Sequence, residues 1–131
     1  AFVSHSTFGQ PVTSRTKHIR KAVDILKEKD VDFEFDGDMQ PDVALNKEYQ
    51  NLYPFSKIVG NANILIMPGQ HSAAISYKMM KTLGDTKVIG PLLIGLGLPI
   101  EIAPLRSSTS EILNLASIAA YSADIIDYKL S

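Results

Sequence analysis

The chain has 131 residues, of which 45% are hydrophobic and 21% charged, a composition typical of one small globular domain. Its formal net charge of −1 argues against broad binding to nucleic acid or anionic membranes, and the absence of cysteine excludes disulfides and thiolate chemistry. The longest apolar run, GPLLIGLGLPI, is too short to cross a bilayer, and the first residues lack the basic start of a signal peptide. We therefore expect a cytoplasmic domain that is a fragment of a longer protein.

The first half of the chain predicts two strands and two helices. AFVSH indicates a buried strand, and VDFEFDG, in which apolar residues alternate with acids up to Gly37, indicates a strand with one buried face. Between them, residues 13–29 predict a helix, and a shorter helix is expected over 42–52. The apolar face of the first helix has the spacing of Ile19, Ala22, Val23 and Leu26. We interpret its basic residues as a solvated face: Arg15, Lys17, Arg20, Lys21, Lys27 and Lys29.

The second half continues the alternation of strands and helices. NILIMPG indicates a strand covered on both faces, and SAAISYKMMKTLG a helix that ends at Gly84. KVIGPLLIG and PIEIAP indicate two further strands, and a last helix is expected over 109–128. The apolar residues of the two helices are, in order, Ala73, Tyr77 and Met80, then Ile112, Leu115, Ala119 and Ile126. This order predicts an α/β fold with a mainly parallel sheet, whose ligands gather at the carboxyl ends of the strands.

One such strand end carries the segment SHSTFGQP, which precedes a helix. Its small residues and free amides suit a phosphate or a carboxylate, and Ser6, Thr7 and Gly9 are the candidate ligand-binding residues. The segment contains neither the glycine pattern of dinucleotide-binding turns nor that of P-loops. A strand-to-helix turn with hydroxyl caps is the alternative interpretation.

Residue types that commonly bind metals are present but are not spaced as metal ligands. His5, His18 and His71 are far apart in the sequence. Asp36, Asp38 and Asp42 form an acidic cluster with oxygen ligands for a divalent cation, but Asp42 suits the start of a helix equally well. We assign no metal site and no catalytic residue in this chain.

The segment APLRSSTSEI precedes the last helix. Ser108 and Glu111 have the spacing of a capping box, in which each side chain binds the other residue's backbone amide. Capping accounts for the hydroxyl residues here and leaves Arg106 as a candidate ligand for an anion.

Several longer segments together resemble phosphate acetyltransferases. They are FDGDMQPDVALN, YPFSKIVGNANILIMPG, AAISYKMMKTLGDTKVIGPLLIGLGLPIEI and SEILNLASIAAY, and the resemblance covers residues 3 to about 121. The chain resembles still more the phosphate-acetyltransferase-related domain at the carboxyl end of long bacterial NADP-dependent malic enzymes. The resemblance implies a three-layer α/β/α sandwich, with a first domain over 1–107 and a helix over 108–131 that packs on the neighbouring domain.

The chain departs from active phosphate acetyltransferases just before the last helix. Those enzymes carry a Ser-Arg-Gly sequence followed by an aspartate. The serine and arginine help to position coenzyme A and phosphate, and the aspartate acts as a base toward the thiol. Here Pro104, Leu105 and Arg106 stand at the serine, arginine and glycine, and Glu111 stands at the aspartate. Leucine offers no charge-assisted hydrogen bond to a phosphate, and proline offers neither a hydroxyl nor an amide. We therefore expect no acetyl transfer by this domain.

By resemblance, such a domain holds the oligomer of its parent enzyme together and binds acetyl-CoA as an inhibitor. The candidate cleft residues are Ser6, Thr7, Gly9, Gly90, Pro91 and Arg106. The resemblance implies no cofactor in this chain and places NADP and a divalent metal (Mg or Mn) upstream in the parent. A homodimer or larger oligomer is expected, with neither nucleic acid nor a membrane as partner. Two alternatives stay open: an active phosphate acetyltransferase and a purely structural dimerisation domain.

Overall fold

The computed structural model describes the backbone of residues 1–85 and 87–130, with side chains described up to Ile125 in the last helix. The chain forms two compact units, Ala1–Met80 and Lys81–Ser131, each of which is described by itself. The boundary expected at residue 107 rests on the packing of the last helix against a neighbouring domain of a longer protein. It therefore stays a prediction.

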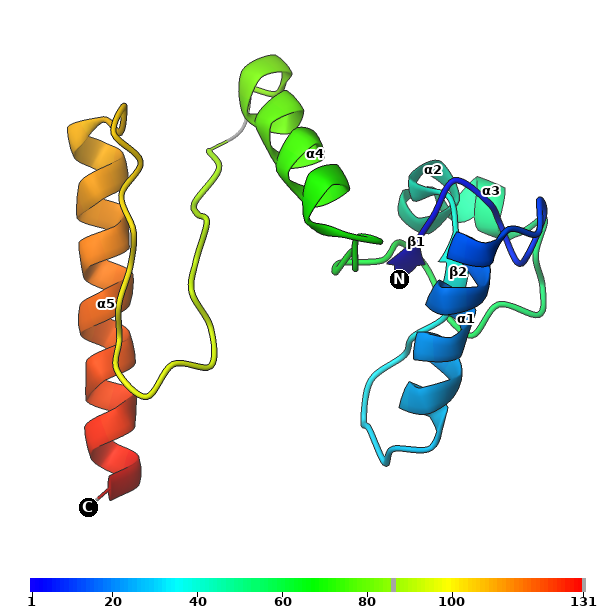
Figure 1. Cartoon of the computed structure of the whole chain (residues 1–131), viewed down its shortest axis with the longest axis horizontal. Helices are drawn as coiled ribbons and strands as arrows, with labels where there is room; N and C mark the ends of the chain where they lie inside the picture. The colour runs from blue at the N-terminus through cyan, green and yellow to red at the C-terminus, as the bar shows by residue number, and fades with distance from the viewer. Residues whose placement is uncertain (86, 131) are drawn as a thin grey trace. The chain divides into compact units, whose positions relative to one another are not determined.

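A small parallel sheet lies at the centre of the first unit (Figure 1). Strand β1 (Phe2–Val3) pairs in parallel with β2 (Gly37–Met39), and on its other edge Phe2 forms a parallel bridge with Ile66. The amide of Val3 donates to the carbonyl of Ile66 at 2.9 Å, and the amide of Ile66 donates to the carbonyl of Ala1 at 2.8 Å. The predicted α/β fold with a parallel sheet is confirmed.

Helix α1 (Ser14–Lys27) covers this sheet and contacts both strands (Figure 1). It begins at Thr13, whose side chain accepts from the amide of Thr16 while the Thr16 side chain accepts from the amide of Thr13. This reciprocal capping satisfies two amides that would otherwise lack partners. Of the predicted apolar face, Val23 is buried and Leu26 is half-buried.

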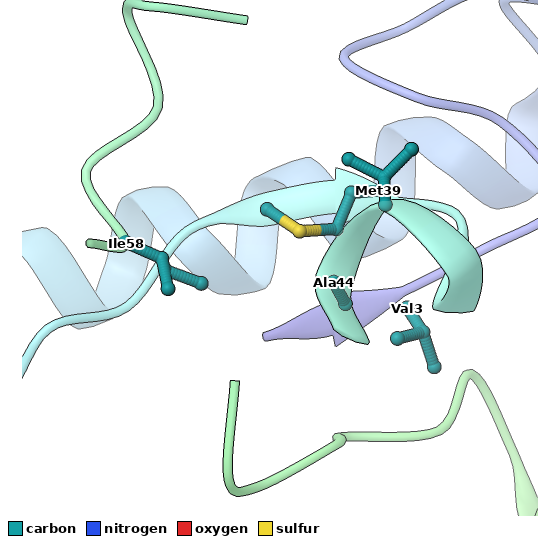
Figure 2. Close-up of a cluster of buried hydrophobic side chains, with 5 residues drawn as sticks. Val3, Met39, Ala44 and Ile58 are labelled. Carbon is teal, nitrogen blue, oxygen red and sulfur yellow. The ribbon is translucent and has the colours of Figure 1, made fainter. Parts of the chain in front are cut away.

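The hydrophobic core of the first unit joins β1, β2, the first of two short helices and the loop residue Ile58 (Figure 2). Helices α2 (Pro41–Leu45) and α3 (Lys47–Gln50) replace the single helix expected over 42–52. The break is at Asn46, whose extended backbone (φ −130°, ψ 113°) ends α2 and whose side chain accepts from the amide of Glu48. The core consists of Val3, Met39, Val43, Ala44 and Ile58.

The strand predicted over VDFEFDG is wrong for most of its length. Residues 31–36 have no regular structure, and the strand begins only at Gly37. The parallel register places Gly37 opposite Phe2, and residues 31–35 pair with no other segment that the structure describes. Alternating hydrophobicity predicts a face to bury, but a strand also requires a hydrogen-bonding neighbour.

The strands predicted in KVIGPLLIG and PIEIAP are also absent, since residues 87–106 contain no strand where the structure describes them. Pro91 and Pro99 offer no amide donor, and the apolar side chains between them are exposed.

The helices on either side are as expected: α4 spans Gln70–Leu83 and α5 spans Thr109–Leu130. On α5, Leu115 is buried and Ile112 is half-exposed, while the side chain of Ile126 lies outside the described residues. Over the described residues, neither these helices nor the shorter ones have the length and apolar content that a membrane span requires.

Gly37 permits the close approach of β1 and β2. Its φ is +153°, and a Cβ atom added there would lie 2.6 Å from the carbonyl oxygen of Phe2 and 2.8 Å from its Cβ. Both atoms belong to the paired strand and cannot move away without breaking the pairing.

We predict that Gly37→Ala lowers the free energy of unfolding by about 3 kcal/mol, because strain and a backbone clash add together. Gly60→Ala is the matched control, since Gly60 also has a positive φ (+87°) but has open space around it. The control should cost about 1 kcal/mol. Urea unfolding followed by circular dichroism measures both; equal losses in the two variants would contradict the assigned role of Gly37.

Candidate functional site

The predicted ligand-binding residues Ser6, Thr7 and Gly9 lie in one turn after β1. A pair of hydrogen bonds between Thr7 and Gln10, each 3.1 Å long, closes this turn. The Oγ atoms of Ser4 and Ser6 are 3.3 Å apart, and both side chains are buried. The structure therefore brings these hydroxyl groups together, and we call residues 4–10 the serine turn.

Asp38 of β2 anchors the serine turn. The hydroxyl of Ser6 donates to Oδ2 of Asp38, and the amide of Phe8 donates to the Asp38 carbonyl at 2.6 Å. The Asp38 side chain is 0% exposed, and its Oδ1 atom accepts no hydrogen bond within the described part of the chain. A buried carboxylate oxygen without a hydrogen bond is costly and needs a compensating charge.

Arg20 of α1 provides that charge. Its Nε atom lies 3.8 Å from Oδ1 of Asp38, and its side chain is 52% exposed. A Cβ atom at Gly9 would lie 2.5 Å from Nη1 of Arg20, so the absence of a side chain at Gly9 lets the guanidinium lie against the turn. Sequence reasoning assigned Arg20 to a solvated face and Asp38 to an acidic cluster, and missed this pairing. The sequence carries no local signal for this pairing, because Arg20 lies in the middle of α1 and Asp38 belongs to β2.

Thr7 is positioned by a second set of hydrogen bonds. Its Oγ1 atom accepts from the amide of Gln40 at 3.2 Å, and the Gln40 side chain donates to the carbonyl of His5 at 2.9 Å. These bonds join the serine turn to the residue that follows β2. The turn is thus held at Asp38 of β2 and at Gln40, the residue that follows it.

The three aspartates of the predicted acidic cluster have separate roles. Asp36 accepts from the amides of Gly37 and Lys57, at 2.9 and 2.8 Å, and Asp42 accepts from the amide of Val43 at 3.0 Å. Asp38 accepts from Ser6. Among the described residues, no three acidic, histidine or cysteine side chains are grouped as they would be around a metal ion.

In the second unit, Glu111 is held at the start of α5. The amide of Ser108 donates to Oε2 of Glu111 at 2.7 Å, and the amide of Glu111 donates to the Ser108 hydroxyl at 3.3 Å, which confirms the predicted capping box. The ammonium of Lys81, near the end of α4, donates to the other carboxylate oxygen, Oε1. Hydrogen bonds from Lys81, the Ser108 amide and the Ser108 hydroxyl lower the pKa of Glu111 to about 2.

The space beside Glu111 is small. A cavity of about 10 Å³, lined by Lys81, Gly90, Pro104 and Glu111 among others, has room for roughly one water molecule. Of the three candidates in this unit, Gly90 lines the cavity, whereas Pro91 and Arg106 have exposed side chains. Among the described residues, the structure does not group Gly90, Pro91 and Arg106 around one space.

We predict a strong energetic coupling between Ser6 and Asp38. Ser6→Ala should lower the free energy of unfolding by about 1–3 kcal/mol, because it leaves a buried carboxylate without its hydroxyl donor. A double-mutant cycle with Asp38→Ala should give a coupling of about 1 kcal/mol or more. The control cycle pairs Ser6→Ala with Asp30→Ala, an exposed aspartate, and should be additive. Additivity in both cycles would show that the pair contributes nothing.

The pKa of Glu111 provides a pH test. A carboxyl with a lowered pKa in the folded state stabilises that state above its ordinary value of 4.5, and the contribution is lost as the pH falls toward 2. Lys81→Met should raise the pKa of Glu111 but leave it below 4.5, because both bonds from Ser108 stay in place. Side-chain NMR titration measures the value. Lys87→Met, at an exposed lysine of the same unit, should leave it unchanged; an unchanged value in Lys81→Met would contradict the ion pair.

Comparison with known proteins extends these observations. Residues 1–120 match the family described as phosphate acetyl/butaryl transferase. The chain is 50% identical over 123 residues to an NADP-dependent malic enzyme of Rhizobium meliloti, covering 94% of this chain and 16% of that protein. It is 32% identical over 124 residues to a phosphate acetyltransferase of Clostridium acetobutylicum, covering 94% of this chain and 37% of that protein.

A solved structure agrees with this result. EutD phosphotransacetylase from Staphylococcus aureus superimposes with a TM-score of 0.82 at 28% identity, over 93% of this chain and 38% of that one. The chain therefore spans about a sixth of the malic enzymes and somewhat over a third of the transferases that it resembles. The expected resemblance to the phosphate-acetyltransferase-like domain of malic enzymes is confirmed. The chain belongs to the phosphate acetyl/butaryl transferase family.

Proposed function

We propose that this chain is a regulatory and oligomerisation domain of an NADP-dependent malic enzyme, that it senses acetyl-CoA, and that it does not transfer acetyl groups itself. The malate site, NADP and the divalent metal belong to other parts of the same protein. The 50% identity to the malic enzyme of Rhizobium meliloti supports the choice of parent enzyme. A cytoplasmic location is part of the proposal and is compatible with a chain that has no cysteine.

The observation that carries the loss of transferase activity is the engagement of Glu111. A general base must be free to accept a proton, and its pKa must be near the working pH. Glu111 instead accepts hydrogen bonds from Lys81 and Ser108, which hold its pKa at about 2. The adjoining cavity has a volume of about 10 Å³, which holds roughly one water molecule.

The serine turn supports the retention of ligand binding. The serine turn lies at the carboxyl end of β1, where ligands of parallel sheets gather, and the guanidinium of Arg20 beside it is 52% exposed. A site that binds a ligand more tightly in one conformation of an enzyme shifts the equilibrium toward that conformation. Binding of acetyl-CoA at such a surface would therefore regulate an active site elsewhere in the protein.

The apolar surface of α5 supports oligomerisation. Leu113 and Tyr121 are largely exposed, and Ile112 is half-exposed, so the helix presents apolar side chains that α5's own unit does not cover. Exposed apolar surface of this extent is typical of contacts with a partner or a neighbouring domain.

An active phosphate acetyltransferase is the second candidate function. It is favoured by the 32% identity to the enzyme of Clostridium acetobutylicum and the 34% identity to that of Bacillus subtilis. Pro104 and Leu105 weigh against it, because neither side chain can bind phosphate.

We predict that acetyl-CoA suppresses malate-dependent NADP reduction by the full-length protein, and that a version without residues 1–131 either loses this inhibition or loses its oligomeric state. Absorbance of NADPH follows the reaction, and sedimentation follows the assembly. Free coenzyme A is the control ligand. Formation of acetyl phosphate from acetyl-CoA and phosphate would favour the transferase, whereas intact malate oxidation without any response to acetyl-CoA would leave only a structural role.

A further inference from the structure

A hollow in the first unit is lined by residues of α1, of the serine turn and of the loop that follows α3. It has a volume of about 380 Å³, which is within the usual range for small-molecule sites. We call it the α1 groove and define it by Phe8, Arg20, Lys27, Gly37, Phe55 and Lys57. The groove shares Arg20 and Phe8 with the surroundings of the serine turn, but the proposed function uses neither Phe55 nor Lys57.

Three cationic side chains and two carboxylates line the groove, and one of the cations, Arg20, also pairs with the buried Asp38. Arg20, Lys27 and Lys57 line it, against the carboxylates of Asp24 and Asp36. Lys27 is paired with Asp24 at 2.8 Å. Both oxygens of Asp36 accept from backbone amides, and the ammonium of Lys57 forms no ion pair with any residue that the structure describes.

Arg20 also retains donors for a ligand. Its contact with Asp38 involves Nε alone, at 3.8 Å, and half of its side chain is exposed. A guanidinium has five N–H donors in a planar arrangement that suits two oxygens of a phosphate. Arg20 and Lys57 can thus both donate to a ligand anion without giving up any hydrogen bond described above.

An aromatic surface borders these cations. The rings of Phe8 and Phe55 meet edge to face, with centroids 4.8 Å apart and planes inclined by 70°. Phe55 is 65% exposed, so its ring is open to a planar ligand. Gly37 adds no side chain to the groove. Nucleic bases stack on aromatic rings while cations bind the attached phosphate, and this is the combination found here.

We propose that the α1 groove binds a nucleoside phosphate, with the base on the ring of Phe55 and the phosphate on Arg20 and Lys57. The ligand is either a free nucleotide or the nucleotide portion of a larger effector, and the two sources share the same recognition chemistry. A simple carboxylate would use the cations but leave the aromatic surface unexplained. The proposal stands whether or not acetyl-CoA is the regulator.

Photolabelling of the full-length protein with 8-azido-AMP tests the proposal directly, because peptide mapping locates the label. We expect labelling of the segment 53–57 or of Phe8, and protection by unlabelled AMP. Lys57→Ala and Phe55→Leu should each reduce labelling about tenfold, as expected for loss of a charged hydrogen bond or of base stacking. Lys21→Ala, at an exposed lysine of α1 outside the groove, is the matched control and should leave labelling unchanged.

Two competitors, adenosine and acetyl-CoA, complete the test. Adenosine tests whether the phosphate is recognised, and acetyl-CoA tests whether the ligand is a free nucleotide or part of a larger effector. Adenosine should protect far less than AMP; equal protection would overturn the assignment of phosphate to Arg20 and Lys57. Absence of label from the groove, or label unaffected by both variants, would overturn the proposal as a whole. Protection by acetyl-CoA would identify the nucleotide portion of that effector as the ligand, and its failure to protect would identify a free nucleotide. Neither result depends on inhibition of malate oxidation, so this test and that of the proposed function fail separately.

Discussion

The first unit depends on the close approach of two parallel strands at Gly37. Because no side chain stands between Gly37 and Phe2, the backbone of β2 reaches the edge of β1. The carboxylates on either side of Gly37 then bind different parts of the chain. Asp36 binds the amide of Lys57, and Asp38 binds the hydroxyl of Ser6. Three residues in a row thus connect the sheet, the serine turn and the loop that follows α3.

Local signals in the sequence predicted the helices well. The capping box predicted at Ser108 defines the first residue of α5, because a cap depends on residues only three positions apart. The helix predicted over 13–29 follows from its apolar spacing, and its cap at Thr13 is seen in the structure. The α/β class and the parallel pairing were also predictable from the order of the elements. The strands over 31–36 and 87–106 were not, because a strand exists only where another strand lies beside it. Hydrophobic alternation carries no information on that neighbour.

The candidate site likewise contains contacts between residues close in the sequence, which could be predicted, and contacts between residues far apart in it, which could not. Ser6, Thr7 and Gly9 are close in sequence, and their common turn could be predicted from the small residues after a strand. The contact of Ser6 with Asp38 spans 32 positions, and that of Lys81 with Glu111 spans 30. Sequence reasoning placed the positive charge of the site at Arg106. In the structure, the guanidinium that adjoins the serine turn is that of Arg20, on a helix whose basic residues the sequence predicts to be solvated.

The segment around Ile66 forms hydrogen bonds with β1 along one edge. Successive residues of a strand direct their backbone groups to opposite edges, so Leu65 directs its amide and carbonyl away from β1. The neighbouring Ile64 and Ile66 have exposed side chains. This extended apolar segment is not a strand, and the backbone of Leu65 forms no bridge to another segment that the structure describes; such an edge is a template on which a strand can add, and proteins normally cover or charge it. The chain prepared by itself would consequently be prone to aggregate through this edge, and its solubility would improve when the edge is covered.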